Sequence, residues 1–343
     1  MPTDFWRNSR VAVIGGGSWG TVLAQLISEN CNDVRIWTRE EDRARSINSQ
    51  RVNPDYVSDM QLSPHVKAYV DLDRVLEGGV DGVIWALPSK ATREEARKFA
   101  PRLKGTEILW HATKGIEERT LKRMTEVLRE ELPLRRLGVI SGPNLATEIA
   151  RGEPAATVVA SDFQEVIRAG HALLNTPRFR VYSSMDVVGI EWAGTLKNIL
   201  AIASGALDAM GLGWNARSML ISRGLAEMVR FGVAMGGQES TFLGLAGVGD
   251  LLATCSSPLS RNYRVGAGLA KGTRLSEVLE GLGSTAEGVQ TARIVADHAR
   301  ERNIYMPITQ AVNTLLQGQV SVQQLMQGLM ARPPMPDRAI GEI

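Results

Sequence analysis

A glycine-rich turn directly after a buried strand is the feature that most constrains this chain. The apolar run Val11–Ile14 is followed by the pattern Gly15-x-Gly17-x-x-Gly20, which opens an apolar-periodic segment that reaches about Ser28. Glycines at these positions allow a tight turn, close approach of the backbone to a pyrophosphate, and close packing of helix on strand. The helix N-terminus adds unpaired N–H groups for an anion. The order of strand, turn and helix predicts a dinucleotide-binding site.

Short apolar runs alternate with helical patterns through the rest of the first half. A charged helix is expected from about Glu41. The runs expected to form strands are Val34–Trp37, Val83–Leu87, Ile108–Trp110, Gly138–Ile140, Thr157–Ala160 and Phe179–Tyr182. Strands that alternate with helices indicate βαβ units and a mainly parallel sheet. We therefore expect an α/β, Rossmann-like, dinucleotide-binding domain over residues 1–187.

The second half has a different character. Strand-like β-branched runs disappear beyond about Asp186, and long patterns rich in Ala, Leu, Met and Gly take over. The segments Ile190–Met210 and Arg217–Met235 are both too long for strands. We expect an all-helical C-terminal substrate domain over residues 188–343.

The composition excludes several classes of protein. With 44% hydrophobic and 22% charged residues, the chain has enough apolar material for sizeable cores, unlike a disordered chain. A net charge of +2 argues against a dedicated nucleic-acid binder. Neither the two cysteines nor the four scattered histidines have metal-site spacing, so no metal is expected.

No segment of the sequence predicts membrane insertion or export. The first ten residues lack the apolar core of a signal peptide. The longest weakly polar stretch, Ile199–Leu207, is far shorter than the ~20 residues that span a bilayer. We expect a cytoplasmic protein with no integral membrane segment.

The end of the second strand bears on which dinucleotide binds. An acidic residue there would hold a ribose 2′-hydroxyl, but the chain has Trp37-Thr38-Arg39. The Arg39 guanidinium can pair with a 2′-phosphate, which favours NADP. The alternative is a solvated arginine that begins the charged run Arg39–Asp42, and NAD use remains open.

Three further turns follow strands at the edge where open α/β sheets bind ligands. They are Ala86–Ser89, Ala112–Gly115 and Ser141–Asn144. The second brings Lys114 to this edge, although a lysine followed by glycine is also common in exposed turns. The third supplies backbone N–H groups and the amide of Asn144.

Two motifs carry polar groups in the helical half. Lys197 lies between Leu196 and apolar residues from Ile199 onward, so burial would lower its pKa and suit it to proton transfer. A lysine that keeps its ammonium group in water is the alternative. Further on, Arg261 stands between Ser260 and Asn262 and is a candidate phosphate clamp, although such a triplet also begins helices.

In order and spacing, these segments resemble the bacterial NAD(P)-dependent sn-glycerol-3-phosphate dehydrogenase family over about residues 10 to 320. The matching motifs are Gly15–Gly20, Ala112–Gly115, Ser141–Pro143, Gly194–Asn198, Ser222–Met228, Gly247–Asp250, Ser260–Asn262, Ala286–Gly288 and Met306–Ile308. The chain departs from the family's usual pattern at Gly16, where alanine is usual, and at Asn144, where serine or threonine is usual. It also lacks the usual Leu-Pro-Gly turn after Tyr56.

The resemblance implies reversible hydride transfer between dihydroxyacetone phosphate and sn-glycerol 3-phosphate, with NADP or NAD, to supply glycerol 3-phosphate for phospholipid synthesis. It implies that Lys197 is the general acid or base, that Lys114 positions the substrate oxygen, and that Asp250 orients both lysines. The substrate-binding residues it implies are Lys114, Gly142, Asn144, Lys197, Asp250, Ser260, Arg261 and Asn262. The implied cofactor-binding residues are Gly15, Gly17, Ser18, Trp19, Gly20, Arg39, Tyr56, Lys114, Ala146, Arg261 and Glu287.

Two other functions stay open at this point. One is a related lysine-dependent dehydrogenase that acts on a β-hydroxy acid. The other is a dinucleotide sensor that keeps the fold and has lost the chemistry. In each case the ligand is a small molecule and not a nucleic acid. The apolar faces of the helical half further predict a homodimer.

Overall fold

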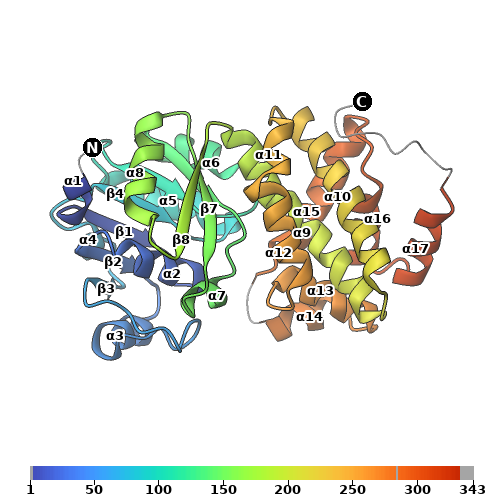
Figure 1. Ribbon diagram of the computed structural model, residues 1–343, viewed down its shortest axis with the longest axis horizontal. Coiled ribbons are helices and arrows are strands. Elements are labelled where there is room, and N and C mark those ends of the chain that lie inside the picture. The colour runs from blue at the N-terminus through green and yellow to red at the C-terminus, as the bar shows by residue number, and fades with distance from the viewer. Residues whose placement is uncertain (1–2, 283–284, 333–343) are drawn as a thin grey trace. The chain divides into compact units, whose positions relative to one another are not determined.

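An eight-stranded sheet forms the centre of the N-terminal unit in the computed structural model, which describes residues 3–282 and 285–332. Its strands, in chain order, are β1 (Arg10–Ile14), β2 (Asp33–Trp37), β3 (Val66–Tyr69), β4 (Gly82–Trp85), β5 (Ile108–His111), β6 (Leu137–Ser141), β7 (Ala155–Ala160) and β8 (Phe179–Ser184). They lie in the order β3-β2-β1-β4-β5-β6-β7-β8 (Figure 1). Neighbours run parallel, except that β7 is antiparallel to β6.

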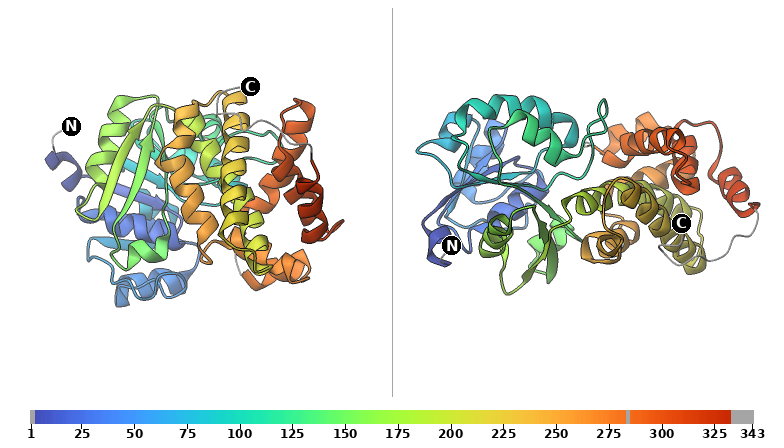
Figure 2. Two further views of the ribbon diagram at one scale, coloured as in Figure 1. Left: turned by 45° about the vertical axis from the view of Figure 1, so that its right-hand side comes forward. Right: turned by 90° about the horizontal axis from the view of Figure 1, so that it is seen from above.

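Helices cover both faces of this sheet (Figures 1 and 2). They are α1 (Thr3–Arg7), α2 (Ser18–Ile27), α3 (Glu41–Gln50), α4 (Leu72–Leu76), α5 (Ser89–Phe99), the 3₁₀ turn η1 (Ala100–Arg102), α6 (Met124–Glu131), α7 (Ala146–Ala150) and α8 (Gln164–Leu174). Strand β1 shows why two layers are needed. Val11 and Val13 join the core formed with α2 and α8, whereas Ala12 and Ile14 join the core formed with α5 and α6. Both sets of alternating side chains are fully buried.

Packing and backbone conformation explain two of the loop glycines. Gly15 has a φ of +121°, and a Cβ there would lie 2.8 Å from the carbonyl oxygen of Ala86. A Cβ at Gly20 would lie 1.9 Å from the carbonyl oxygen of Gly15. The turn therefore closes only with glycine at both positions. A Cβ at Gly17 would meet nothing within 4 Å, so packing does not explain this glycine.

The second unit is helical. Its elements are α9 (Val187–Ala209), α10 (Trp214–Ala234), α11 (Glu239–Leu243), the π-helical turn η2 (Leu245–Gly249), α12 (Asp250–Ser256), α13 (Arg261–Ala270), α14 (Leu275–Leu282), α15 (Glu287–Glu301), α16 (Pro307–Leu316) and α17 (Val322–Met330). These elements confirm the predicted fold class, an α/β Rossmann-like part followed by an all-helical part. Within the described part of the chain, every helix is too short or too polar to span a lipid bilayer.

One short segment of the first half packs with the helices. The residues from Lys114 to Leu121 group with the chain from Val188 onward, whereas the rest up to Val187 forms the N-terminal unit. Ile116 is buried in the helical core beside residues of α9 and α10. The domain bounds 1–187 and 188–343 stay a prediction, and residues 333–343 lie outside the described part of the chain.

A buried carboxylate holds two helices of this unit together. Glu227 of α10 accepts hydrogen bonds from the backbone N–H groups of Ile308 (2.5 Å) and Thr309 (3.0 Å), and from the Thr309 hydroxyl (3.0 Å). These donors belong to the first turn of α16, where N–H groups have no partner within the helix. Burial raises the pKa of Glu227 to about 7, although the three hydrogen bonds and Arg230 act in the opposite direction.

We predict that Glu227→Ala lowers the free energy of unfolding by about 2–4 kcal/mol, because two buried N–H groups lose their acceptor. The measurement is urea denaturation at pH 8. Glu280→Ala is the matched control, since Glu280 is exposed on α14 and should change stability by less than about 0.5 kcal/mol. An equal decrease in the free energy of unfolding in the two variants would contradict this role for Glu227.

Candidate active site

Two lysines and one aspartate form a compact cluster inside the helical unit. Lys197, on α9, donates from Nζ to Oδ1 of Asp250 and to the Thr254 hydroxyl, the latter at 2.7 Å. Lys114 donates from Nζ to the other carboxylate oxygen of Asp250 at 2.7 Å. Lys197 and Asp250 are 5% and 1% exposed, and Lys114 is partly buried. One carboxylate therefore orients two ammonium groups.

The chain directly before Asp250 is closely packed. Turn η2 presses its backbone against α11, so that a Cβ at Gly247 would lie 2.0 Å from the carbonyl oxygen of Phe242. Asp250 then begins α12, and Thr254 follows one turn later on the same face. The Thr254 hydroxyl donates to Asp250 Oδ1 at 3.3 Å, so it contacts both the carboxylate and the Lys197 ammonium group.

The surroundings lower the pKa of Lys197 from 10.5 to about 7. Burial is the largest cause, because it disfavours the charged ammonium group. The positive charge of Lys114 acts in the same direction, whereas the Asp250 carboxylate raises the pKa. Burial and the second lysine outweigh the aspartate.

This arrangement suits proton transfer beside a developing negative charge. Two ammonium groups and one carboxylate leave a net charge of +1 when all are ionised, which stabilises an alkoxide formed nearby. An amine with a pKa of about 7 can give or take a proton near neutral pH. The structure thus brings Lys114, Lys197 and Asp250 together. The sequence analysis did not include Thr254 in the site.

A second group of predicted residues lies in the same unit, where α13 meets α15. Ser260 caps α13, accepting from the Tyr263 N–H at 3.3 Å, and Arg261 is the exposed first residue of that helix. Asn262 accepts from the Gly288 N–H at 2.9 Å. A Cβ at Gly288 would also lie 2.6 Å from the carbonyl oxygen of Asn198. The residue after Lys197 is therefore close to the first turn of α15, which begins at Glu287.

The remaining predicted residues belong to the N-terminal unit. Gly17 is the N-cap of α2, with extended backbone and no side-chain cap, so the first N–H groups of the helix are available to an anion. Ser18 is the first residue of α2. Trp19 faces inward, with its ring 6.4 Å from the ring of Phe179. Ala146 packs against the same core.

The turn after β6 is tied to strand β7. Asn144 donates to the carbonyl oxygen of Ala156 at 3.1 Å and accepts from the Thr157 hydroxyl at 2.9 Å. A Cβ at Gly142 would lie 3.1 Å from the Cα of Thr157. In this structure the Asn144 amide therefore fixes the turn with both of its polar atoms.

Two polar residues that the sequence analysis missed, Arg43 and Asn53, contact the end of β2 and the glycine loop. Arg39 is exposed and makes no hydrogen bond or ion pair with the described residues. Arg43 of α3, in contrast, bonds to Thr38, Glu40 and Asp55 and lies over the Tyr56 ring. Asn53 also went unnoticed: its amide donates to the Gly16 carbonyl oxygen at 3.0 Å and to the Thr21 hydroxyl at 2.7 Å. Only the polar character of these residues could have drawn attention to them.

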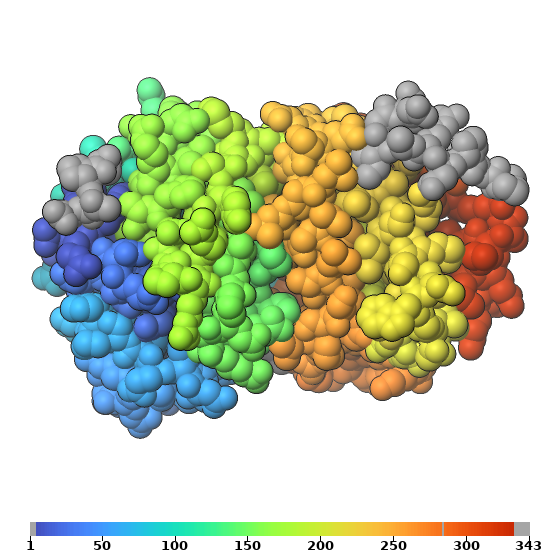
Figure 3. Space-filling view, in the orientation of Figure 1, coloured from blue at the N-terminus to red at the C-terminus, as the bar shows by residue number. Residues whose placement is uncertain are grey.

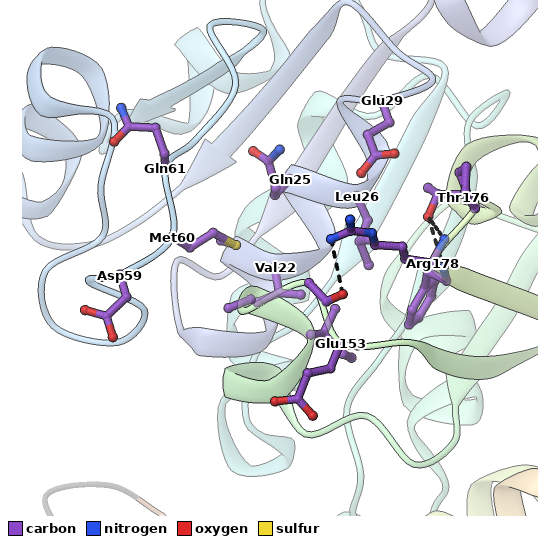
Figure 4. A pocket seen from close by; sticks show the side chains of 15 residues that line it. Val22, Gln25, Leu26, Glu29, Asp59, Met60, Gln61, Glu153, Thr176 and Arg178 are labelled. Carbon is purple, nitrogen blue, oxygen red and sulfur yellow. Dashed lines mark hydrogen bonds between the residues drawn. The ribbon is translucent and has the colours of Figure 1, made fainter.

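A cavity in the N-terminal unit lies away from all of these residues. It has a volume of about 390 Å³ and opens over the outer face of α2, between residues 59–61 and the start of β8 (Figure 4). Arg178 extends across it and donates to the Gly152 carbonyl oxygen at 3.4 Å. None of the predicted site residues lines it. No metal-binding group of His, Cys, Asp or Glu occurs within residues 3–282 and 285–332.

Comparison with protein families gives two matches. Residues 10–167 match the family described as NAD-dependent glycerol-3-phosphate dehydrogenase N-terminus. Residues 186–327 match the corresponding C-terminus. The two matches together cover most of the chain.

Individual proteins agree with these matches. The glycerol-3-phosphate dehydrogenase [NAD(P)+] of Pseudomonas paraeruginosa is 46% identical over 327 residues, which cover 95% of this chain and 96% of that protein. The solved glycerol-3-phosphate dehydrogenase of Coxiella burnetii is 36% identical, covers 96% of this chain and 100% of its own, and has a TM-score of 0.90. A PanE/ApbA family ketopantoate reductase of Ralstonia eutropha covers 92% of this chain and 99% of its own at a TM-score of 0.56. At 16% identity it shows the shared fold alone.

Proposed function

The chain belongs to the NAD-dependent glycerol-3-phosphate dehydrogenase family, and from this membership we propose that it interconverts dihydroxyacetone phosphate and sn-glycerol 3-phosphate. The predicted family and the predicted NAD(P)-dependent oxidoreductase are confirmed. Relatives that carry this name over nearly their whole length favour this activity over a β-hydroxy acid dehydrogenase or a dinucleotide sensor.

The observation that carries the proposal is the shared carboxylate of Asp250. It holds the Lys197 and Lys114 ammonium groups on its two oxygens, so both point to one place. In ketone reduction Lys197 donates a proton to the carbonyl oxygen, and in alcohol oxidation it accepts that proton. Lys114 stabilises the negative charge on the same oxygen.

The N-terminal unit fits a dinucleotide. The space at Gly17 and the uncapped N-terminus of α2 suit a pyrophosphate. When bound, the reduced cofactor supplies the hydride. Gly15, Gly17, Ser18 and Gly20 would hold the pyrophosphate, and Arg39 and Tyr56 would lie near the adenosine. Trp19, Lys114, Ala146, Arg261 and Glu287 complete the proposed cofactor set, and a preference for NADP over NAD stays a prediction from Arg39.

The substrate phosphate is assigned to the start of α13. Arg261 offers a guanidinium at the first position of a helix, where the N–H groups also favour an anion. Ser260 and Asn262 flank it and are buried. Gly142 and Asn144 complete the proposed substrate set. Because the Asn144 amide already bonds to Ala156 and Thr157, its contact to substrate would require those bonds to change.

The wider setting is part of the proposal. The reduction direction would supply glycerol 3-phosphate for phospholipid synthesis, and the enzyme would act in the cytoplasm. Exposed apolar side chains on α10, the helix that is yellow in the colour sequence of Figure 3, favour a homodimer. Trp214, Met219 and Val233 of this helix are 75%, 47% and 39% exposed. A dimer would remove this apolar surface from water.

Turnover tests the role of Lys197. The wild-type protein should oxidise NADPH or NADH when dihydroxyacetone phosphate is added, as followed by absorbance. Lys197→Ala should lower kcat by about 10²–10⁴-fold, because the proton donor is lost, while cofactor binding is kept. Lys271→Ala is the control, since Lys271 is exposed after α13. Near-normal turnover of Lys197→Ala would refute the role of Lys197.

The Michaelis constant for the phosphorylated ketone tests the role of Arg261. Arg261→Ala should raise KM for dihydroxyacetone phosphate by about 10–100-fold, because a charge-assisted hydrogen bond is lost. KM for dihydroxyacetone, which lacks the phosphate, should change little. Arg264→Ala, which removes another exposed arginine from α13, is the control. An unchanged KM for the phosphorylated ketone in Arg261→Ala would exclude the clamp.

The molecular mass in solution tests the proposed homodimer. Sedimentation equilibrium at micromolar concentration should give twice the chain mass of 37.3 kDa. Trp214→Glu together with Met219→Glu should shift the equilibrium to monomers, because two charges would enter the apolar contact. A wild-type protein that is monomeric at every concentration would exclude the dimer.

A further inference from the structure

An acidic residue lies close to where a dinucleotide-binding fold of this kind recognises its ribose. Glu40 comes twenty residues after Gly20, the third glycine of the loop. In such folds an acidic residue at about this spacing accepts a hydrogen bond from the ribose 2′-hydroxyl of NAD. Arg39, directly before it, has the opposite preference, because its guanidinium suits the 2′-phosphate of NADP.

Contacts with Thr38 connect Glu40 to the glycine loop. The Thr38 hydroxyl donates to Oε2 of Glu40 at 2.9 Å. A Cβ at Gly16 would lie 2.9 Å from the Cβ of Thr38, so this threonine packs directly on the loop. Alanine at position 16, which is usual in the family, would require Thr38 to move. Glu40 is thus fixed beside the backbone that would carry the pyrophosphate.

The guanidinium of Arg43 holds Glu40 from the other side. It donates to Oε2 of Glu40 and, at 3.1 Å, to the Thr38 hydroxyl. Its Nε and Nη2 donate to Asp55 at 3.0 and 2.8 Å. The guanidinium also lies 4.9 Å from the centre of the Tyr56 ring. Four N–H groups of Arg43 are therefore engaged within the protein, and its side chain is only 11% exposed.

These contacts leave the Oε1 atom of Glu40 and the guanidinium of Arg39 available to a ligand. Glu40 is 45% exposed at its side chain, and its Oε1 accepts no hydrogen bond from the described residues. Arg39 is exposed and makes no polar contact within the described chain. Arg43 is also cationic, but its contacts with two carboxylates make it a poor partner for a phosphate.

We propose that Glu40 is a second cofactor-specificity residue, which accepts from the ribose 2′-hydroxyl of NAD(H) and repels the 2′-phosphate of NADP(H). Arg43 is its positioning residue. The relative affinity for the two cofactors then depends on Glu40 and Arg39 acting in opposite directions. This inference rests on the proposed function, because it requires that the N-terminal unit bind a nicotinamide dinucleotide.

The test is cofactor binding without substrate, measured by the change in NADH and NADPH fluorescence. Glu40→Gln should weaken the binding of NADH and tighten the binding of NADPH. The ratio of the two dissociation constants should therefore shift by about tenfold toward NADPH. Asp42→Asn is the matched control, because it removes the same charge from an exposed position on α3. In Asp42→Asn the ratio of the two dissociation constants should stay within about twofold of the wild-type ratio.

Two more variants separate specificity from folding. Arg39→Ala should weaken NADPH binding selectively. The ratio of the two dissociation constants should therefore shift toward NADH, opposite to the shift expected for Glu40→Gln. Arg43→Met leaves the Glu40 carboxylate in place but removes the guanidinium that holds it. Glu40→Gln should therefore shift the ratio of the two dissociation constants less in the Arg43→Met background than in wild type. Thermal unfolding checks that each variant is folded.

Each outcome has one meaning. A wild-type protein that binds neither cofactor would contradict the proposed function itself. A wild-type protein that binds both, with an unchanged ratio in folded Glu40→Gln, would overturn the inference and leave the proposed function intact. A ratio shifted equally by Asp42→Asn would also overturn it, because general charge would then explain the effect. A full shift by Glu40→Gln in the Arg43→Met background would exclude Arg43 as the positioning residue.

Discussion

The active site depends on a single carboxylate that two lysines share. Asp250 is almost fully buried, and an unpaired charge there would be costly. Lys197 and Lys114 compensate that charge from two different segments of the chain, so both ammonium groups are fixed relative to each other. The same burial lowers the pKa of Lys197 to about 7. The contact with Asp250 therefore fixes the geometry, and burial together with Lys114 provides the acidity that proton transfer needs.

The fold around this carboxylate is arranged to keep it in place. Turn η2 directly precedes Asp250, and its backbone packs so closely on α11 that only glycine fits at position 247. Lys114 comes from a segment whose Ile116 is buried in the helical core, although it follows a strand of the N-terminal unit in the sequence. The contact of Glu227 with α16 stabilises the helices of this unit without entering the chemistry. Stability and reactivity thus depend on separate buried acids.

Local patterns predicted much of the fold, because strand, glycine turn and helix are encoded within about twenty residues. The edge strand β3 was missed, since Val66–Tyr69 is too short to show a period. Resemblance, not spacing, indicated that Lys114, Lys197 and Asp250 act together. Thr254 was left out of the predicted site because its role depends on which side chains meet in the folded chain, and no local pattern carries that information. Glu40 has the spacing of a ribose-binding acid, but Arg39 directly before it directed the prediction toward NADP. Only the contacts of Glu40 with Thr38 and Arg43 show how its carboxylate is held.

The most direct test of the central claim is the pH dependence of kcat/KM in both directions. The ammonium form of Lys197 is the proton donor, so ketone reduction should fall as the pH rises through about 7. The neutral amine is the acceptor, so alcohol oxidation should rise over the same range. Opposite profiles with a shared midpoint near 7 are the predicted result. A midpoint near 10 in both directions would show that burial does not tune this lysine, and would contradict the account.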